Sequence, residues 1–155
     1  MLITEVTQPQ FNNWVFPNAA TLEADFQEYK KKEDSKWKSR AQSMGFRFPI
    51  FDTFQDFVST LKSSPVITLT KEHDRRVMNR SHTSSIASLK SLVGTYYMPR
   101  DVDRIVQGYQ SNAAMPHPII LKGTHGEWIM AGNTRLDTAF IMGVTPKVLY
   151  VDVSN

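Results

Sequence analysis

The stretch that decides the fold runs from residue 117 to residue 153 and reads HPIILKGTHGEWIMAGNTRLDTAFIMGVTPKVLYVDV. It opens with two short apolar runs, residues 117–123 and 127–131, which are separated by a glycine-bounded segment of hairpin composition. The spacing of one helix face then follows at Leu136, Ala139, Phe140 and Gly143. A last run, residues 147–153, alternates like a strand. The pattern predicts strand, hairpin, strand, tight turn, helix and strand, in that order.

The tight turn carries the residues with the clearest chemical potential. Gly132 lets the backbone bend sharply and lets a ligand approach closely, and Asn133 is a good N-cap for the helix that follows. The free N–H groups of a first helical turn form an anion site together with the helix dipole. Arg135 lies off the apolar face, where its guanidinium can grip a phosphate through two parallel bonds. We therefore expect Gly132, Asn133, Thr134 and Arg135 to bind phosphate; the alternative is an ordinary cap beside a surface arginine.

These residues resemble the signature of a known family. The run AGNTRLDTA, preceded by PIIL and the hairpin, is similar to the ParB/sulfiredoxin-like superfamily pattern of a Pro-Ile strand, a hairpin and Gly-x-x-Arg opening a helix. The matching residues are Pro118, Ile119, Gly132, Arg135 and Ala139. The resemblance covers roughly residues 99–153 and implies a nucleotide-phosphate site at the turn. Family members use that site to bind CTP, ATP or ADP, variously for a DNA clamp, sulfinic acid repair or serine phosphorylation.

Two departures from the family pattern narrow what the resemblance implies. The chain has no cysteine, which excludes the sulfinic acid repair of sulfiredoxins. Chromosome-partitioning members carry Gly-Glu-Arg-Arg at the turn where this chain has Gly-Asn-Thr-Arg, and they continue into a helix-turn-helix domain. We therefore expect a free-standing member of the phage type rather than a centromere-binding protein.

Length and composition agree with one globular domain of mixed α/β (α+β) class, built on a small mixed sheet. The 155 residues suffice for a sizeable core, and no run approaches the roughly 20 apolar residues that span a membrane. The N-terminus does not resemble a secretory signal, so we expect a cytoplasmic protein, in the host cytoplasm if it is phage-encoded. We expect residues 1–65 to form a mostly helical N-terminal extension on a nucleotide-binding core of residues 66–155.

Other elements follow from the same apolar spacing and capping signals. Helices are expected at about 21–33, from Asp52 or Thr53 to about 63, from Ser84 or Ser85 to about 96, and from Pro99 onward. Strands are expected at residues 2–8 and 66–70, and a loop at 111–116.

A cluster of basic residues lies between Lys30 and Arg40, although the net charge of +3 is too small to indicate nucleic-acid binding by itself. Within it, Lys36 and Lys38 flank Trp37 and can neutralise phosphates while the indole stacks on an unpaired base. The alternative is a solvated helix face with Trp37 packed on the core.

The most polar stretch follows the strand at 66–70 and reads KEHDRRVMNRSHT, residues 71–83. We expect a loop, and loops at strand ends commonly carry function. Its carboxylates, Glu72 and Asp74, are candidates for a general base or for holding Mg²⁺. Its cationic side chains can neutralise phosphate oxygens or contact nucleic acid: Arg75, Arg76 and Arg80. The alternative is an exposed loop whose charges pair internally.

A second acidic pair, Asp101 and Asp103, stands in the first turn of the helix that begins at Pro99. Stabilisation of the helix dipole is the interpretation we prefer, and a D-x-D metal site is the alternative.

The function that this pattern favours is phosphoryl transfer or nucleotide hydrolysis with ATP or CTP and Mg²⁺. The acceptor would be a hydroxyl group, for example on a modified base of phage DNA, an idea that rests on family analogy. The alternatives are a DNA- or protein-binding module that is switched by nucleotide, and a nuclease.

Overall fold

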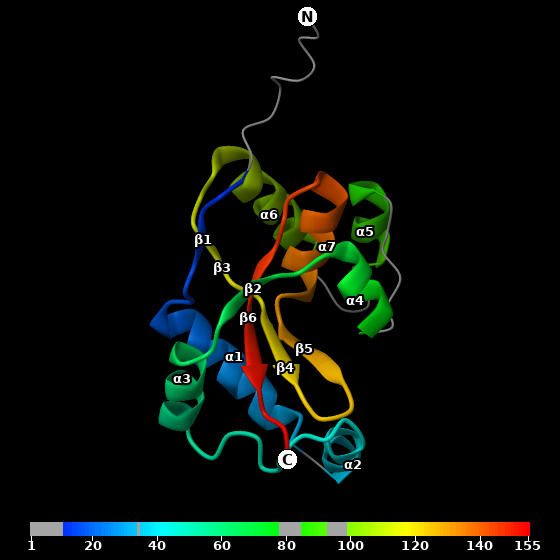
Figure 1. The fold of residues 1–155 in the computed structure, drawn as a ribbon. Coiled ribbons are helices and arrows are strands. Elements are labelled where there is room, and N and C mark those ends of the chain that lie inside the picture. The colour runs from blue at the N-terminus through cyan, green and yellow to red at the C-terminus, as the bar shows by residue number, and fades with distance from the viewer. Residues whose placement is uncertain (1–10, 34, 78–84, 93–98) are drawn as a thin grey trace, which may run out of the picture.

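A computed structural model describes residues 11–33, 35–77, 85–92 and 99–155 (Figure 1). The predicted strand at 2–8, the end of the helix predicted to reach 96, and Arg80 lie outside the described residues. The described elements, in chain order, are β1 (Trp14–Val15), α1 (Ala19–Lys31), α2 (Ser35–Ser43), α3 (Phe54–Lys62), β2 (Val66–Thr68), α4 (Lys71–Val77), α5 (Ile86–Leu92), α6 (Pro99–Ser111), β3 (Met115–Pro116), β4 (Ile119–Lys122), β5 (Glu127–Ala131), α7 (Asn133–Met142) and β6 (Lys147–Asp152).

A four-stranded mixed sheet with the order β2-β6-β4-β5 forms the centre of the fold. β4 and β5 make the predicted antiparallel hairpin, and β6 runs parallel to β4 on its other side. β5 and β6 lie on opposite sides of β4, so the chain passes β4 between them, and α7 lies in that connection. The sheet is thus mixed, as the sequence predicted, and the α+β class is confirmed.

One face of the sheet packs against α1 and α3, which Figure 1 shows together on one side of the strands. Alternate residues of β4 and β6 point toward this face, and they meet aromatic and aliphatic side chains of the two helices. The cluster includes Ile119, Leu121, Leu149, Val151, Leu22, Phe26, Tyr29, Phe57 and Leu61. Because α1 and α3 supply about a third of the buried residues of this cluster, the described residues that precede β2 contribute to the same hydrophobic core as the sheet.

The opposite face packs against α7. Ile120, Ile129 and Val148 of the sheet contact Leu136 of that helix in one apolar cluster. α6 packs on α7 in turn, with Ile105 and Tyr109 against Ala139, and α5 packs against both α6 and α7. The result is a layered arrangement in which α7 lies between the sheet and α6.

Several predictions from the decisive stretch are confirmed. The hairpin, the helix after the turn and the last strand all occur where expected, and α7 ends at Gly143 in the left-handed conformation, with φ of 72°. One detail was wrong: Gly132, not Asn133, is the N-cap of α7, with φ of 97°. Asn133 is the first helical residue, and the left-handed bend falls on the glycine, which adopts a positive φ without steric cost.

The predicted loop at residues 71–83 was also wrong for its first half, which forms α4. The side chain of Thr70 accepts a hydrogen bond from the backbone N–H of His73 at 3.0 Å, and its carbonyl accepts one from Asp74 at 3.0 Å. Thr70 therefore caps the helix, and the two acidic residues of the first turn favour it through the helix dipole. The high polarity of the segment concealed this capping signal.

The predicted loop at 111–116 is in part a strand, since β3 pairs in parallel with β1 near the N-terminus. Trp14 and Phe11 then pack on Tyr109 of α6, with ring centroids 5.7 and 4.9 Å apart. This pairing fixes the segment that leads from α6 into β4, and that segment lines the pocket described next.

Candidate functional site

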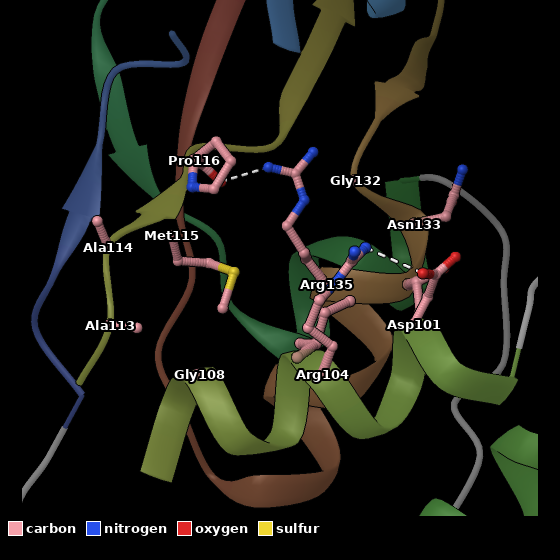
Figure 2. A pocket seen from close by; sticks show the side chains of 12 residues that line it. Asp101, Arg104, Gly108, Ala113, Ala114, Met115, Pro116, Gly132, Asn133 and Arg135 are labelled. Atoms are coloured by element: carbon pink, nitrogen blue, oxygen red, sulfur yellow. Dashed lines mark hydrogen bonds and ion pairs between the residues drawn. The ribbon is translucent and has the colours of Figure 1, made fainter. Parts of the chain in front are cut away.

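A pocket of about 530 Å³ opens between α6, the β3 segment and the turn at Gly132 (Figure 2). Its volume is within the range of small-molecule sites. The antiparallel hairpin explains its position: Ala131, at the end of β5, pairs with Ile119, at the start of β4, so the turn lies beside Pro116 and Pro118. The lining residues are Asp101, Arg104, Ile105, Gly108, Ala113, Ala114, Met115, Pro116, Gly132, Asn133, Thr134 and Arg135.

All four residues predicted to bind phosphate therefore line one pocket. Gly132 is required there for two reasons: its φ is positive, and a Cβ would stand 2.7 Å from Cβ of Pro118. The first intrahelical hydrogen bond of α7 joins the N–H of Leu136 to the carbonyl of Gly132 at 2.9 Å. The N–H groups of Thr134 and Arg135 precede that bond, at positions where an α-helix offers no acceptor of its own.

The guanidinium of Arg135 is mostly buried and turns back along β3. Its Nη1 donates a hydrogen bond to the carbonyl of Pro116, which Figure 2 draws as a dashed line. Among the described residues this is the only hydrogen bond that the guanidinium donates, so Nε and Nη2 keep donors for a ligand. A planar group fixed by one nitrogen is already oriented for a bidentate contact through the others.

Asp25 of α1 lies close enough to Arg135 for their charges to interact. Burial raises the pKa of Asp25, and the positive charge of Arg135 opposes that rise. Burial lowers the pKa of Arg135, and Asp25 and Tyr109 oppose that shift; a guanidinium nevertheless stays protonated in proteins. Oδ2 of Asp25 is buried and accepts no hydrogen bond from the described residues. Asp25 therefore offsets part of the positive potential of the pocket.

Tyr109, which projects from α6, forms a hydrogen bond with the backbone of the turn. Its hydroxyl donates a hydrogen bond to the carbonyl oxygen of Arg135 at 2.7 Å, and burial raises its pKa well above the usual range. The bond ties the first turn of α7 to the helix that forms another wall of the pocket.

The two aspartates at the start of α6 do not act as a pair. Asp101 lines the pocket and binds Nη2 of Arg104 at 2.9 Å, whereas Asp103 binds Nζ of Lys90 at 2.9 and 3.1 Å. Because the two carboxylates bind different cations, the geometry does not support the D-x-D metal site. Among the described residues, no group of three or more His, Asp or Glu side chains is arranged to hold a metal ion by itself.

The predicted catalytic carboxylates, Glu72 and Asp74, lie on α4 and do not line this pocket. Asp74 is completely buried, with an exposed fraction of 0%, and so has no surface to offer a substrate, while Glu72 and Arg75 are exposed. The side chain of Arg76, like all of Arg80, lies outside what the structure describes. The catalytic role of Glu72 and Asp74 stays a prediction that the pocket does not support.

A polar cluster that the sequence did not reveal connects α4 to the sheet. Nε2 of His73 lies 3.1 Å from Oε1 of Glu127, and the ring of Tyr150 lies edge-on to His73 at 6.2 Å. Burial and a hydrogen bond to Glu127 raise the pKa of Tyr150. These three residues come from α4, β5 and β6, so the tertiary fold brings them together rather than any local spacing in the sequence.

The basic cluster around α2 contains one aromatic residue that packs on the core and basic residues that are exposed. Trp37 packs on the core, 4.8 Å from the ring centroid of Trp128, as the alternative interpretation expected. Lys38 is exposed, with Nζ 5.7 Å from the ring of Phe48, and the side chain of Lys36 lies outside what the structure describes. An indole held in this way is poorly placed to stack on a base.

Comparison with protein-family models, with curated proteins and with solved structures gave no match for this chain. Within the described ranges, none of the helices is long and apolar enough to cross a membrane.

Sequence reasoning missed Arg104, which lines the pocket, and it missed Tyr109 and Asp25, which interact with Arg135. Arg104 and Tyr109 stand in a helix that reads as an ordinary amphipathic element, and Asp25 stands in another, far from the turn in sequence. Asp101 was noticed, but its pairing with Arg104 at i,i+3 was not, although that spacing signals neighbours on a helix surface.

Proposed function

We propose that the pocket at Gly132 binds the phosphates of a nucleotide, ATP or CTP, and that the protein transfers or hydrolyses the terminal phosphoryl group. The observation that carries the proposal is the Arg135 guanidinium, which lines a pocket beside the first turn of α7 and donates one hydrogen bond among the described residues. The order of β4, hairpin, β5, Gly132 turn and α7 also supports the resemblance to the ParB/sulfiredoxin-like superfamily, which is part of this proposal.

The phosphate would lie against two kinds of donor. The N–H groups of Asn133, Thr134 and Arg135 point out of the start of α7, where the helix dipole favours an anion. Nε and Nη2 of Arg135 add charge-assisted hydrogen bonds in a site that is partly shielded from water. The bond from Nη1 to Pro116 keeps the guanidinium in place before the ligand arrives, which reduces the entropy lost on binding.

The pocket leaves room for more than a phosphate. Its other wall consists of small or apolar side chains from α6 and the β3 segment, namely Ile105, Gly108, Ala113, Ala114 and Met115. Mostly apolar walls with a few placed polar groups are typical of small-molecule sites. An organic group attached to the phosphates therefore fits better than a free inorganic anion.

In the transfer reaction, the acceptor oxygen forms a bond to the terminal phosphorus while the bond from that phosphorus to the bridging oxygen breaks. The acceptor loses its proton to a base, and the leaving diphosphate keeps the electron pair of the broken bond. Asp101 is the carboxylate that lines the pocket, and we assign it the role of base in place of Glu72 and Asp74. With water as acceptor the same steps are hydrolysis.

Mg²⁺ fits this arrangement as a partner of the nucleotide rather than as a resident ion. Magnesium commonly keeps several waters and binds through one or two carboxylates together with substrate phosphates. Asp101 supplies one such carboxylate at the pocket, and bound Mg²⁺ would neutralise charge on the phosphate oxygens.

The test incubates purified protein with ATP or CTP labelled in the terminal phosphate, with Mg²⁺, and with or without DNA. Release of labelled phosphate indicates hydrolysis, and label on DNA indicates transfer. Arg135→Gln should abolish both while circular dichroism shows an intact fold. Asp101→Asn should stop turnover and Glu72→Ala should not; the reverse result restores the α4 assignment. Unchanged turnover in Arg135→Gln would refute the proposed site, and DNA cleavage without nucleotide would favour the nuclease.

A second function, contact with a nucleic-acid backbone, has one observation in its favour. Lys31, Lys32, Lys38 and Arg40 are all exposed along the end of α1 and α2. Such a surface binds phosphates without reading sequence, so its affinity for DNA should fall steeply with salt. Replacing Lys38 and Arg40 with Glu should weaken DNA binding in a mobility-shift assay and leave nucleotide turnover unchanged; equal DNA binding would remove this function.

A further inference from the structure

A second arginine lines the same pocket from a different element. Arg104 projects from α6, one wall of the pocket, whereas Arg135 comes from the turn, and Figure 2 shows their guanidinium groups at separate places in the pocket. Their environments differ as well. Arg135 is mostly buried and bound to Pro116, while the side chain of Arg104 is 78% exposed.

Arg104 is held weakly. Among the described residues its only hydrogen bond joins Nη2 to Oδ1 of Asp101 at 2.9 Å, a single bond between neighbours on one helix. Exposed pairs of this kind contribute little to stability, about 0–1 kcal/mol. A phosphate offers the same guanidinium a bidentate contact and more negative charge. An anionic ligand can therefore take Arg104 from Asp101 at small cost.

The two guanidinium groups differ in what they can hold. Arg135 shares its place with the N–H groups at the start of α7, so one phosphate occupies its donors. Arg104 lies on the α6 wall of the pocket and is exposed, so it is available for a second phosphate of the same nucleotide. Two like charges in one pocket also repel each other when it is empty, and a polyphosphate between them removes that repulsion.

We propose that Arg104 is the residue that makes the pocket prefer nucleoside triphosphates and diphosphates over monophosphates. This inference rests on the proposed function, since it assumes that Arg135 holds one phosphate. It goes beyond that function because it assigns to Arg104 the binding of a second phosphate, by which the pocket distinguishes nucleotides of different phosphate number. It also makes Asp101 the group that competes for Arg104 in the empty pocket.

The experiment measures dissociation constants by calorimetry for AMP, ADP and ATP, and for CMP, CDP and CTP, with Mg²⁺ at fixed ionic strength. The wild-type protein should bind the triphosphate more tightly than the monophosphate. Arg104→Ala should weaken triphosphate binding about ten- to a hundredfold, as expected for lost hydrogen bonds to a charged group. It should leave monophosphate binding almost unchanged, so that the preference largely disappears.

Two further variants make the result specific. Lys62→Ala removes one positive charge from an exposed position at the end of α3, outside the pocket, and should keep the full preference. Asp101→Asn removes the competitor and, when measured without Mg²⁺, should tighten triphosphate binding relative to the wild type under the same condition. Because Arg104 and Lys62 are both exposed, neither substitution is expected to unfold the protein.

The possible outcomes distinguish a failure of the proposed function from a failure of the role proposed for Arg104. If the wild-type protein binds no nucleotide at all, the proposed function fails and this inference fails with it. If nucleotides bind and Arg135→Gln abolishes binding, but Arg104→Ala keeps the preference for triphosphate, the proposed function stands and this inference is overturned. An equal loss for all three phosphate lengths in Arg104→Ala would also overturn it.

Discussion

The chain contains a matched pair of glycines that tests the geometry of the turn. Gly132 begins α7 and Gly143 ends it, and both have positive φ, 97° and 72°. Their surroundings differ sharply. A Cβ on Gly143 would meet nothing within 4 Å, whereas a Cβ on Gly132 would lie 2.7 Å from Cβ of Pro118 and 3.1 Å from Nη2 of Arg135. Alanine at the two positions therefore separates backbone strain from steric conflict.

The expected losses of stability follow from these contacts. A left-handed alanine costs about 1–2 kcal/mol, and the reduced entropy of the unfolded chain returns about 0.4–1 kcal/mol. Gly143→Ala should therefore lose between about 0 and about 1.6 kcal/mol. Gly132→Ala should lose a further amount of about 1–3 kcal/mol, because the added methyl group overpacks the contact with Pro118.

Urea unfolding measures the free energy of unfolding of both variants against the wild type, with the slope of the transition as a check on two-state behaviour. Nucleotide affinity gives a second readout, since the methyl group of Gly132→Ala would also displace the guanidinium of Arg135. We expect Gly132→Ala to lose nucleotide binding and Gly143→Ala to keep it. Equal stability and equal affinity in the two variants would refute the geometry of the turn.

Three other predictions concern residues that do not line the pocket. Burial raises the pKa of Asp25, so the folded protein binds the proton of this carboxyl more tightly than the unfolded chain does. The carboxyl therefore contributes stability at low pH, and this contribution is lost as the pH rises through the pKa of the folded state. Asp25→Asn should accordingly gain stability over the wild type at about pH 7 and lose that advantage toward about pH 4, below which the carboxyl is largely protonated in both states; an advantage that does not change with pH would contradict this. Phe57→Ala, at a residue with an exposed fraction of 0%, should cost about 3–5 kcal/mol, and Val66→Ala, at 48%, about 0.5 kcal/mol or less, both measured by urea unfolding. Tyr109→Phe removes the hydrogen bond to the carbonyl of Arg135 and should cost about 1 kcal/mol together with a loss of nucleotide affinity; unchanged affinity would mean that this bond does not position the turn.

The sequence predicted the C-terminal third well because local signals there agree with one another. Gly-bounded apolar runs, helical spacing from Leu136 and a glycine at the end of the helix each specify one element, and the elements are adjacent in the chain. Residues 71–77 show the opposite case. Their polarity is typical of a loop, but Thr70 caps a short helix whose His73 and Asp74 turn toward the protein.

The candidate site was predictable only in part, for a related reason. The Gly132 turn is a local feature, and its four residues do line a pocket. The rest of the pocket depends on which surfaces the tertiary fold brings together. Nothing in the spacing around Arg104 or Asp25 shows that α6 forms the opposite wall or that α1 places a carboxylate near Arg135. Trp37 likewise resembled a stacking residue until its contact with Trp128 was known.

The most direct test of the proposed phosphate site is an NMR titration of the labelled protein with ATP and Mg²⁺, following backbone amides and arginine side chains. If the phosphates bind at the Gly132 turn, the largest shifts, all with one affinity, occur at the amides of Asn133, Thr134 and Arg135 and at Nε of Arg135, while the amide of Gly143 barely moves. Saturable binding that leaves those four signals in place, or no binding at millimolar nucleotide, would contradict it.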